Sequence, residues 1–342
     1  METELFLSNF KHHQPSTLTV ITTYKCNAAC TNCCFECNPQ RQATLTLDRI
    51  KDNILNAKRS YPKLQLVVFT GGECFTLGQN LFEAISFASS LGLHTRCVTN
   101  GYWGKTKLNA DKVAIKLLDA GLSELNISTG IEHQEWVSIE SIINAAESTS
   151  QLGFRPLIMV EEDTYEGKHF EKLVKNEKIS TLLLKNLINI QSNCWVDFRE
   201  NKNRTKYSSN CNLLYSGCSQ LFNNIVITPH NYLASCCGLT LEHIPSLKLG
   251  NLENNTISEL YKSQFDEFIK IWLYVDGPYK IINKVCGYDY LENKFGIIHH
   301  QCQACFYLFQ DKHIINCIKE QYKKHIVDVL SSLVLKNKVE QL

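Results

Sequence analysis

Short apolar segments alternate with helix-like segments through the first half of this 342-residue chain. Strands are predicted at residues 18–23, 64–70, 93–99, 124–128, 155–160 and 181–187, and helices at 45–60, 80–91, 109–120 and 138–151. Because strands that are connected by helices form parallel sheets, this pattern predicts an α/β fold with about six β/α units. Periodicity alone leaves open whether the sheet is doubly wound or forms an incomplete barrel.

The second half of the chain has a different character. Residues 191–210 are polar and irregular, and beyond them the β/α alternation is lost while cysteines recur. A chain of this length can form two domains. We therefore expect five segments, which are an N-terminal arm (1–15), a core α/β domain (16–190), a linker (191–210), a smaller cysteine-rich domain (211–310) and a C-terminal helix (311–342).

Composition argues against several classes of function. The net charge of +1 gives no electrostatic reason to expect nucleic acid or a membrane surface as a partner. No apolar run is long enough to span a membrane, and the first residues lack the basic and apolar regions of a secretory signal. The 16 cysteines therefore favour thiolate-bound metal in a reducing compartment, the cytoplasm, over disulfides.

Three cysteines follow the first predicted strand with the spacing C-x3-C-x2-C. They are Cys26, Cys30 and Cys33. Three thiolates on one tight loop can bind three irons of a [4Fe–4S] cluster and leave the fourth iron open to a substrate. A structural zinc site usually has four protein ligands. Because Cys34 and Cys37 lie close by, a zinc loop is an alternative.

Polar motifs end the next three predicted strands. These motifs are Gly71-Gly72-Glu73, Thr99-Asn100-Gly101 and Ser128-Thr129-Gly130. Glycines at the end of a strand let the backbone approach a ligand closely, and a carboxylate beside them can accept hydrogen bonds from an ammonium group. The carboxyl ends of parallel strands are the usual place for an active site.

Together with the cysteine loop, these motifs resemble the radical S-adenosylmethionine (SAM) superfamily. The resemblance implies a partial (β/α)6 TIM-type barrel and a SAM-binding [4Fe–4S] cluster on the three loop cysteines. It also implies SAM-binding roles for six residues, which are Gly71, Gly72 and Glu73 at the methionine amino group, Thr99 and Asn100 near SAM, and Ser128 at the ribose or carboxylate.

Two parts of the sequence depart from the family pattern. Asn32 stands where the family usually has an aromatic residue beside the adenine, which affects the adenine contact and not the cluster. In the third motif, Gly130 and Glu132 replace or displace an acidic position of the family. Only Ser128 of that motif is therefore carried over as a site residue.

Four cysteines in the second half surround a predicted hairpin and end in a C-x2-C pair. They are Cys218, Cys236, Cys302 and Cys305. The arrangement resembles the SPASM or shorter twitch extension of radical SAM enzymes, which implies one auxiliary [4Fe–4S] cluster. A zinc site is the alternative, because cysteine thiolates bind both zinc ions and iron–sulfur clusters.

Other cysteines have secondary interpretations. Cys237 is an alternative ligand to Cys236, and Cys211 and Cys286 are the candidates if a second auxiliary cluster is present. The remaining thiols are interpreted as ordinary buried or surface cysteines, namely Cys74, Cys97, Cys194 and Cys317.

The family resemblance implies a reaction class. Such enzymes reductively cleave SAM to a 5′-deoxyadenosyl radical, which abstracts hydrogen from a substrate. Members with this extension mostly modify ribosomally synthesised precursor peptides by crosslinking, epimerisation or backbone excision, as oxidoreductases or lyases, with flavodoxin or ferredoxin as electron donor. The alternatives are a radical SAM enzyme that acts on a small metabolite and a non-enzymatic zinc or iron–sulfur protein. The sequence assigns no catalytic base or radical quencher.

Residues 22–39 (TTYKCNAACTNCCFECNP) resemble in particular the maturases of nif11-type leader peptides, which include the tyramine-excising spliceases. No leader-peptide-binding module is recognisable near the N-terminus. If the substrate is a precursor peptide, a separate leader-peptide-binding protein is therefore expected as a partner.

Overall fold

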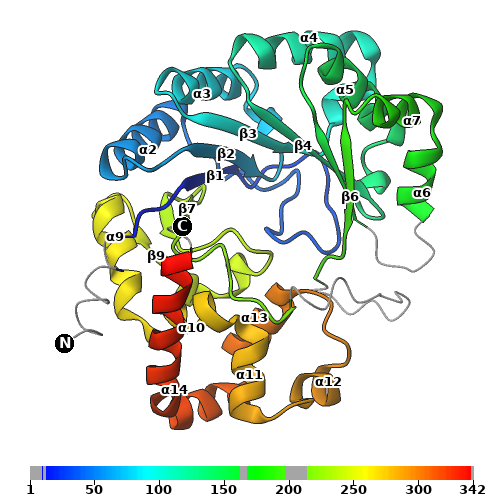
Figure 1. Cartoon of the computed structure of the whole chain (residues 1–342). Coiled ribbons are helices and arrows are strands. Elements are labelled where there is room, and N and C mark those ends of the chain that lie inside the picture. The colour runs from blue at the N-terminus through cyan, green and yellow to red at the C-terminus, as the bar shows by residue number, and fades with distance from the viewer. Residues whose placement is uncertain (1–9, 11–12, 162–167, 197–213, 340–342) are drawn as a thin grey trace. The chain divides into compact units, whose positions relative to one another are not determined.

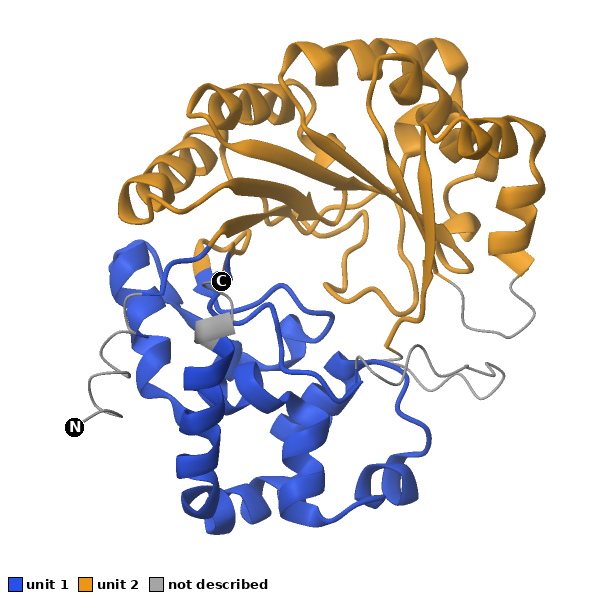
Figure 2. Cartoon of the chain, viewed as in Figure 1, with its two compact units in different colours: residues 1–15, 208–225, 233–342 blue, residues 16–207, 226–232 orange. Residues whose placement is uncertain are grey.

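The computed structural model describes residues 10, 13–161, 168–196 and 214–339. The chain divides into two compact units (Figure 2). The parallel-sheet unit comprises residues 16–207 and 226–232, and the C-terminal unit comprises residues 1–15, 208–225 and 233–342. The finer division into five segments stays a prediction. No helix in the described ranges combines the length and the apolar character needed to cross a membrane.

Six parallel strands form the framework of the parallel-sheet unit (Figure 1). They are β1 (Thr17–Thr23), β2 (Leu66–Gly71), β3 (His94–Thr99), β4 (Glu124–Gly130), β5 (Leu157–Glu161) and β6 (Asn189–Asn193). Their order in the sheet is β6-β5-β4-β3-β2-β1, so each strand pairs with the next one along the chain. A doubly wound sheet would reverse its order at a switch point, whereas a monotonic order is that of a barrel.

Helices cover the outer face of this curved sheet (Figure 1). They are α2 (Leu47–Ser60), α3 (Gln79–Ser90), α4 (Lys107–Asp119), α5 (Ile139–Gln151), α6 (Lys168–Lys175) and α7 (Glu177–Leu184). The hydroxyls of Thr46, Thr106 and Ser138 each accept a backbone hydrogen bond at the start of a helix. Such a cap stabilises a helix by about 1 kcal/mol.

Five of the six predicted strands match observed strands to within a few residues. The sixth prediction is wrong, because residues 181–184 belong to helix α7. The Asn176 side chain accepts hydrogen bonds from the backbone N–H groups of Lys178 and Ile179 and thereby caps this helix. Strand β6 follows instead and runs to Asn193, into the segment interpreted as a linker.

The C-terminal unit combines short strands with six α-helices among its described residues. The strands β7 (Asn224–Ile227), β8 (Tyr232–Ala234) and β9 (Lys248–Asn251) are neighbours in that order, and residues 226–232 at the β7–β8 turn count with the parallel-sheet unit. The helices are α9 (Ile257–Ser263), α10 (Phe268–Asp276), α11 (Pro278–Cys286), α12 (Tyr290–Phe295), α13 (Gln301–Gln310) and α14 (Lys312–Val339).

Aromatic side chains fill part of the core of the C-terminal unit. The ring of Phe10 lies 5.1 Å from that of Phe222 and 5.2 Å from that of Phe265. Tyr261 donates a hydrogen bond to the backbone carbonyl of Phe222 at 2.6 Å. Because Phe10 is buried among these rings, this residue of the predicted N-terminal arm is part of the core.

Candidate functional site

The cysteine loop, residues 26–37, follows β1 in the parallel-sheet unit. Cys26 is buried, and Cys30 and Cys33 are half-buried. The backbone N–H of Ala28 donates to Cys26 Sγ at 3.4 Å, and that of Cys37 donates to Cys33 Sγ at 3.3 Å. Two of the three predicted ligands thus have the backbone donors that stabilise a thiolate.

The electrostatics of the cysteine loop favour a bound cation. Burial raises the pKa of Cys26 to about 12, and the nearby charges of Glu73 and Cys33 add to this shift. Burial likewise raises the pKa of Cys30, with the charge of Cys33 as the next cause. Hydrogen bonding from the Cys37 thiol is the main cause that lowers the pKa of Cys33 to about 6. Because several thiolates here would repel one another, a positively charged metal group is needed to ionise all of them, and this donor set fits one.

The two glycines that end β2 pack directly against the start of the cysteine loop. A Cβ atom on Gly72 would lie 2.4 Å from the Lys25 carbonyl oxygen and 3.1 Å from Cys26 Cβ, and one on Gly71 would lie 2.4 Å from the Thr23 carbonyl oxygen. The Gly72 N–H donates to this same Thr23 oxygen at 2.7 Å. The close approach expected of these glycines is therefore made to the backbone of Thr23 and Lys25, directly before the loop, and it fixes the point where the loop leaves β1.

Glu73 is completely buried behind the loop and accepts three hydrogen bonds. The Thr99 hydroxyl and the Phe75 N–H donate to Oε1 at 2.9 and 3.0 Å, and the Asn100 N–H donates to Oε2 at 2.7 Å. Burial nevertheless raises the pKa of Glu73 to about 7. Two motifs that are separate in the sequence, at the ends of β2 and β3, thus meet on one carboxylate.

Asn100 also connects this carboxylate to the cysteine loop. Its Nδ2 atom donates to Asn27 Oδ1 at 2.9 Å and lies 3.8 Å from Cys26 Sγ. Ser128 is half-buried near the carboxyl end of β4, at the same edge of the sheet. The structure therefore gathers Glu73, Thr99 and Asn100 beside Cys26, and the role of Ser128 stays a prediction.

Glu132 is a site residue that the sequence did not identify. Its Oε2 accepts from the Asn32 backbone N–H at 2.7 Å, and its Oε1 accepts from Asn32 Nδ2 at 2.8 Å. Both residues are buried, so these two bonds tie the loop to the end of β4 in a dry environment. The two departures from the family pattern, at positions 32 and 132, are thus partners of each other.

A second carboxylate, Glu161, extends this network at the end of β5. Its Oε2 accepts from the Glu132 N–H at 3.3 Å and lies 3.5 Å from His133 Nδ1. The His133 ring packs edge-on against Trp195, with 4.9 Å between ring centroids. The one sequence signal for Glu161 was its position at the end of an apolar strand that finishes at the same edge as the other motifs.

A cavity of about 330 Å³ lies within the C-terminal unit. Its lining includes Cys218, Cys236, Cys302 and Cys305. Cys302 and Cys305 are three residues apart on α13 and so share a helix face. Burial raises the pKa of all four thiols, for Cys302 to about 12, and the charges of neighbouring thiols add to the shift for Cys236, Cys302 and Cys305. Four thiols that line one cavity are a suitable ligand set for a metal cluster.

The alternative cysteines differ in their surroundings. Gly238 lies between two of the lining sulfurs, since a Cβ atom on it would be 3.1 Å from Cys302 Sγ and 3.7 Å from Cys236 Sγ. Cys237 also lines the cavity, but its sulfur accepts from Asn224 Nδ2 at 3.1 Å. This geometry favours Cys236 as the ligand. Cys211 lies outside the described residues, and Cys286 is not part of this lining.

Sequence comparison relates the cysteine loop to a known superfamily. Residues 20–151 match the sequence profile of the radical SAM superfamily. YydG of Bacillus subtilis (strain 168), whose name refers to peptide biosynthesis, is 25% identical over 131 residues, which are 38% of this chain and 41% of YydG. The match therefore spans less than half of that relative.

Structure comparison agrees on the fold. Native anSMEcpe with bound AdoMet, which is SAM, gives a TM-score of 0.60 at 13% identity over 93% of this chain and 99% of that chain. Native anSMEcpe with bound AdoMet and Cp18Cys peptide gives 0.56 at 14% identity over 90% of this chain and 99% of that chain. At such identities the likeness establishes the fold alone. The predicted partial barrel is confirmed, and residues 20–151 of this chain form a radical SAM domain.

Proposed function

We propose that this chain is a radical SAM enzyme that modifies a ribosomally synthesised precursor peptide. The observation that carries the proposal is the convergence of Glu73, Thr99 and Asn100 beside Cys26 within the radical SAM domain. In this proposal the three cysteines of the loop hold a [4Fe–4S] cluster. When bound, the cluster and SAM supply the reducing electron and the group that abstracts hydrogen from the substrate.

Glu73 is the residue that we assign to the SAM ammonium group. A carboxylate offers about four lone-pair positions, and three are taken by the donors described above, which leaves one for a ligand. Because burial raises the pKa of Glu73 to about 7, a neighbouring cation would favour its ionised form strongly. Thr99 and Asn100 orient this carboxylate, while Gly71 and Gly72 position the loop beside it.

Asn32 and Glu132 are positioning residues in this proposal. Two hydrogen bonds from one residue to one carboxylate fix both the backbone and the side chain of Asn32, one position before the last cluster ligand. We assign Ser128, at the adjacent strand end, to the ribose or carboxylate of SAM. The cluster loop is thereby held between the ends of β2 and β4.

We further propose that Cys218, Cys236, Cys302 and Cys305 hold one auxiliary [4Fe–4S] cluster. Four thiolates ligate all four irons, so such a cluster offers no open iron and suits electron transfer. Zinc in the same cavity is the competing assignment. The iron content of the reconstituted protein decides between them.

The substrate class rests on the relatives. YydG carries a name that refers to peptide biosynthesis, and the fold of this chain is shared with a protein solved together with a peptide. The proposal includes a flavodoxin or ferredoxin as electron donor, a separate leader-peptide-binding protein, and the reducing cytoplasm as location. Whether the reaction is that of an oxidoreductase or a lyase depends on the bond that is changed.

The first experiment tests SAM chemistry. The protein is reconstituted anaerobically with iron and sulfide and is then given SAM and dithionite. We expect formation of 5′-deoxyadenosine, and its loss to background when Cys26, Cys30 and Cys33 are all changed to Ala. A protein that holds zinc without iron and leaves SAM intact would support the non-enzymatic alternative and contradict the proposal.

The second experiment tests the substrate. A short peptide encoded beside this protein is co-expressed with and without it, and its mass is measured. A mass change that requires the intact cysteine loop supports peptide modification. Vigorous SAM cleavage without any change in such a peptide, but with conversion of a small metabolite in cell extract, would favour the metabolite alternative.

A further inference from the structure

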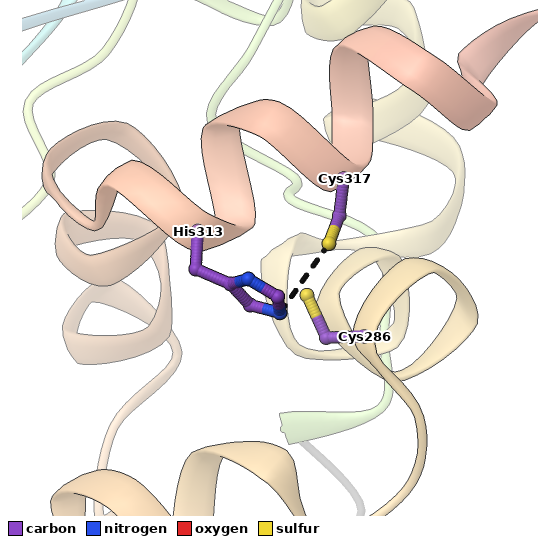
Figure 3. Close-up of side chains that lie close together, drawn as sticks. All are labelled: Cys286, His313 and Cys317. Atoms are coloured by element: carbon purple, nitrogen blue, oxygen red, sulfur yellow. Dashed lines mark hydrogen bonds between the residues drawn. The ribbon is translucent and has the colours of Figure 1, made fainter.

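Three metal-binding side chains come together in the C-terminal unit outside the lining of the cysteine cavity (Figure 3). Cys286 is the last residue of α11, and His313 and Cys317 lie near the start of α14. Their ligand atoms all lie within 4.8 Å of one another. Within the described ranges, no other three histidine, cysteine or acidic side chains form such a group.

Local structure fixes the positions of these residues. His313 and Cys317 are four residues apart, so they lie one above the other on one face of α14. Asp311 accepts hydrogen bonds from the N–H groups of His313 and Ile314 at 3.1 and 3.0 Å and thereby begins this helix. Helix α11 ends just after Cys286, where Gly287 adopts a positive φ of 92°.

Further contacts hold the two helices and the imidazole ring in place. Gln321, one turn beyond Cys317, donates to the carbonyl oxygen of Val285 at 2.8 Å and so joins α14 to the end of α11. The Tyr290 ring stacks on His313, with 5.1 Å between centroids and 28° between planes. This stacking restricts the orientation of the imidazole ring.

The distance between two of the ligand atoms is that of a tetrahedral metal site. His313 Nε2 and Cys317 Sγ are 3.5 Å apart. Metal bonds of ~2.3 Å to sulfur and ~2.0 Å to nitrogen at a tetrahedral angle place the two ligand atoms ~3.5 Å apart. The pair can thus bind one ion with little rearrangement.

We propose that Cys286, His313 and Cys317 bind one Zn²⁺ ion, with water as the fourth ligand. Two thiolates and an imidazole are a donor set of zinc, whereas iron–sulfur clusters are held mainly by cysteine alone. The two cysteines are half-buried and His313 is exposed, which leaves a solvent side for the fourth ligand. The ion would link α11 to α14, and none of its three ligands lines the cysteine cavity. This site also gives Cys286 and Cys317 a role other than second-cluster ligand or ordinary thiol.

The test uses the full chain with its iron–sulfur clusters reconstituted. We expect about one zinc per chain by elemental analysis, and a zinc K-edge X-ray absorption spectrum with two sulfur and two nitrogen or oxygen neighbours. Each of Cys286→Ser, His313→Gln and Cys317→Ser should lower zinc at least tenfold and leave iron unchanged. The matched controls Cys194→Ser and His325→Gln, the latter on the same helix, should retain zinc.

Three results would overturn this site. One is a zinc spectrum with four sulfur neighbours, which would place the ion among the cavity thiols. Another is undiminished zinc in Cys317→Ser. The third is a zinc-free wild-type protein in which mass spectrometry finds a Cys286–Cys317 disulfide. If a variant fails to fold, the wild-type spectrum still decides, together with the fall in melting temperature that a zinc chelator should cause.

Discussion

The two predicted cluster sites hold their cysteines in different ways. In the parallel-sheet unit, Cys26, Cys30 and Cys33 come from one short loop, and the ends of neighbouring strands hold that loop through backbone contacts and buried carboxylates. In the C-terminal unit the four thiols come from segments that are far apart in sequence and meet around a cavity. The first site therefore depends on a few close contacts, and the second depends on the folding of a whole unit.

Removal of cysteine ligands should have the largest effect, and this effect should differ between the two sites. Cys26→Ala with Cys30→Ala should abolish 5′-deoxyadenosine formation, because the loop keeps a single ligand. Cys302→Ala with Cys305→Ala should lower the iron content by about one [4Fe–4S] cluster, since only two thiolates of that set remain. SAM cleavage should persist in the second variant, without peptide modification. Equal loss of SAM cleavage in both would mean that the two sites are not independent.

Removal of the Glu73 charge should act on SAM and spare both clusters. A hydrogen bond between charged groups in a buried site contributes ~1.5–3 kcal/mol, so Glu73→Gln should weaken SAM binding about 10- to 100-fold. Equilibrium binding of SAM to the reconstituted protein measures this effect. Glu124→Gln, which removes an exposed carboxylate paired with Arg96, is the control and should bind SAM normally. Unchanged affinity in Glu73→Gln would remove Glu73 from the SAM site.

Added methyl groups should test the close contacts of each site. In Gly72→Ala the new Cβ would lie 2.4 Å from the Lys25 carbonyl oxygen, so the loop must shift, at a cost of about 1–3 kcal/mol. In Gly238→Ala it would lie 3.1 Å from Cys302 Sγ, which a small movement can relieve. We expect partial iron loss from the loop in the first variant and near-normal iron in the second.

Gly153→Ala is the control for a glycine change away from both sites, because its Cβ would meet nothing within 4 Å. Its positive φ of 89° strains alanine, so this control should lower the urea midpoint without loss of iron. Iron per chain and the urea midpoint are measured for all three. An iron content in Gly72→Ala equal to that of the control would show that the glycine contact does not hold the loop.

The smallest expected effect is a pH dependence that belongs to the parallel-sheet unit. Burial raises the pKa of Glu73 from 4.5 to about 7, so the folded state binds this proton more tightly than the unfolded state does. The stabilisation of the folded state by this proton is fully present below about pH 4.5 and is lost as the pH rises towards 7. Without SAM, the wild type should therefore lose about 1 kcal/mol more unfolding free energy than Glu73→Gln between pH 6 and 8. Urea denaturation at the two pH values measures this difference, and parallel curves for the two proteins would contradict it.

The fold could be predicted where apolar runs of the sequence form buried parallel strands. The strands that carry the motifs were located because each run ends in glycine or polar residues, as at Gly71 and Thr99. The run at 181–187 was misleading, because a short apolar run fits a helix or a strand equally well and the cap at Asn176 decided for the helix.

The proposed ligands are recognisable from the sequence, whereas most of the residues that support them are not. The cysteine loop and the Glu73 motif are local in sequence, so spacing identified them. Glu132 and Glu161 act across the sheet, 100 residues from Asn32 in the case of Glu132, and no local pattern reports such a contact. The group at Cys286, His313 and Cys317 was missed for the same reason, since two helices bring it together.

The Asn32–Glu132 pair restricts how this sequence can evolve. An aromatic residue at position 32 would remove the side-chain donor and leave the buried Glu132 carboxylate with fewer partners, while loss of Glu132 alone would strand the Asn32 amide. Substitution of either residue alone therefore gives a less stable protein, so we expect the two positions to change together. Relatives that carry Asn at the first position should carry a carboxylate at the second, and those with an aromatic residue should lack it. We therefore expect residues 32 and 132 together to distinguish one group of related sequences from the others.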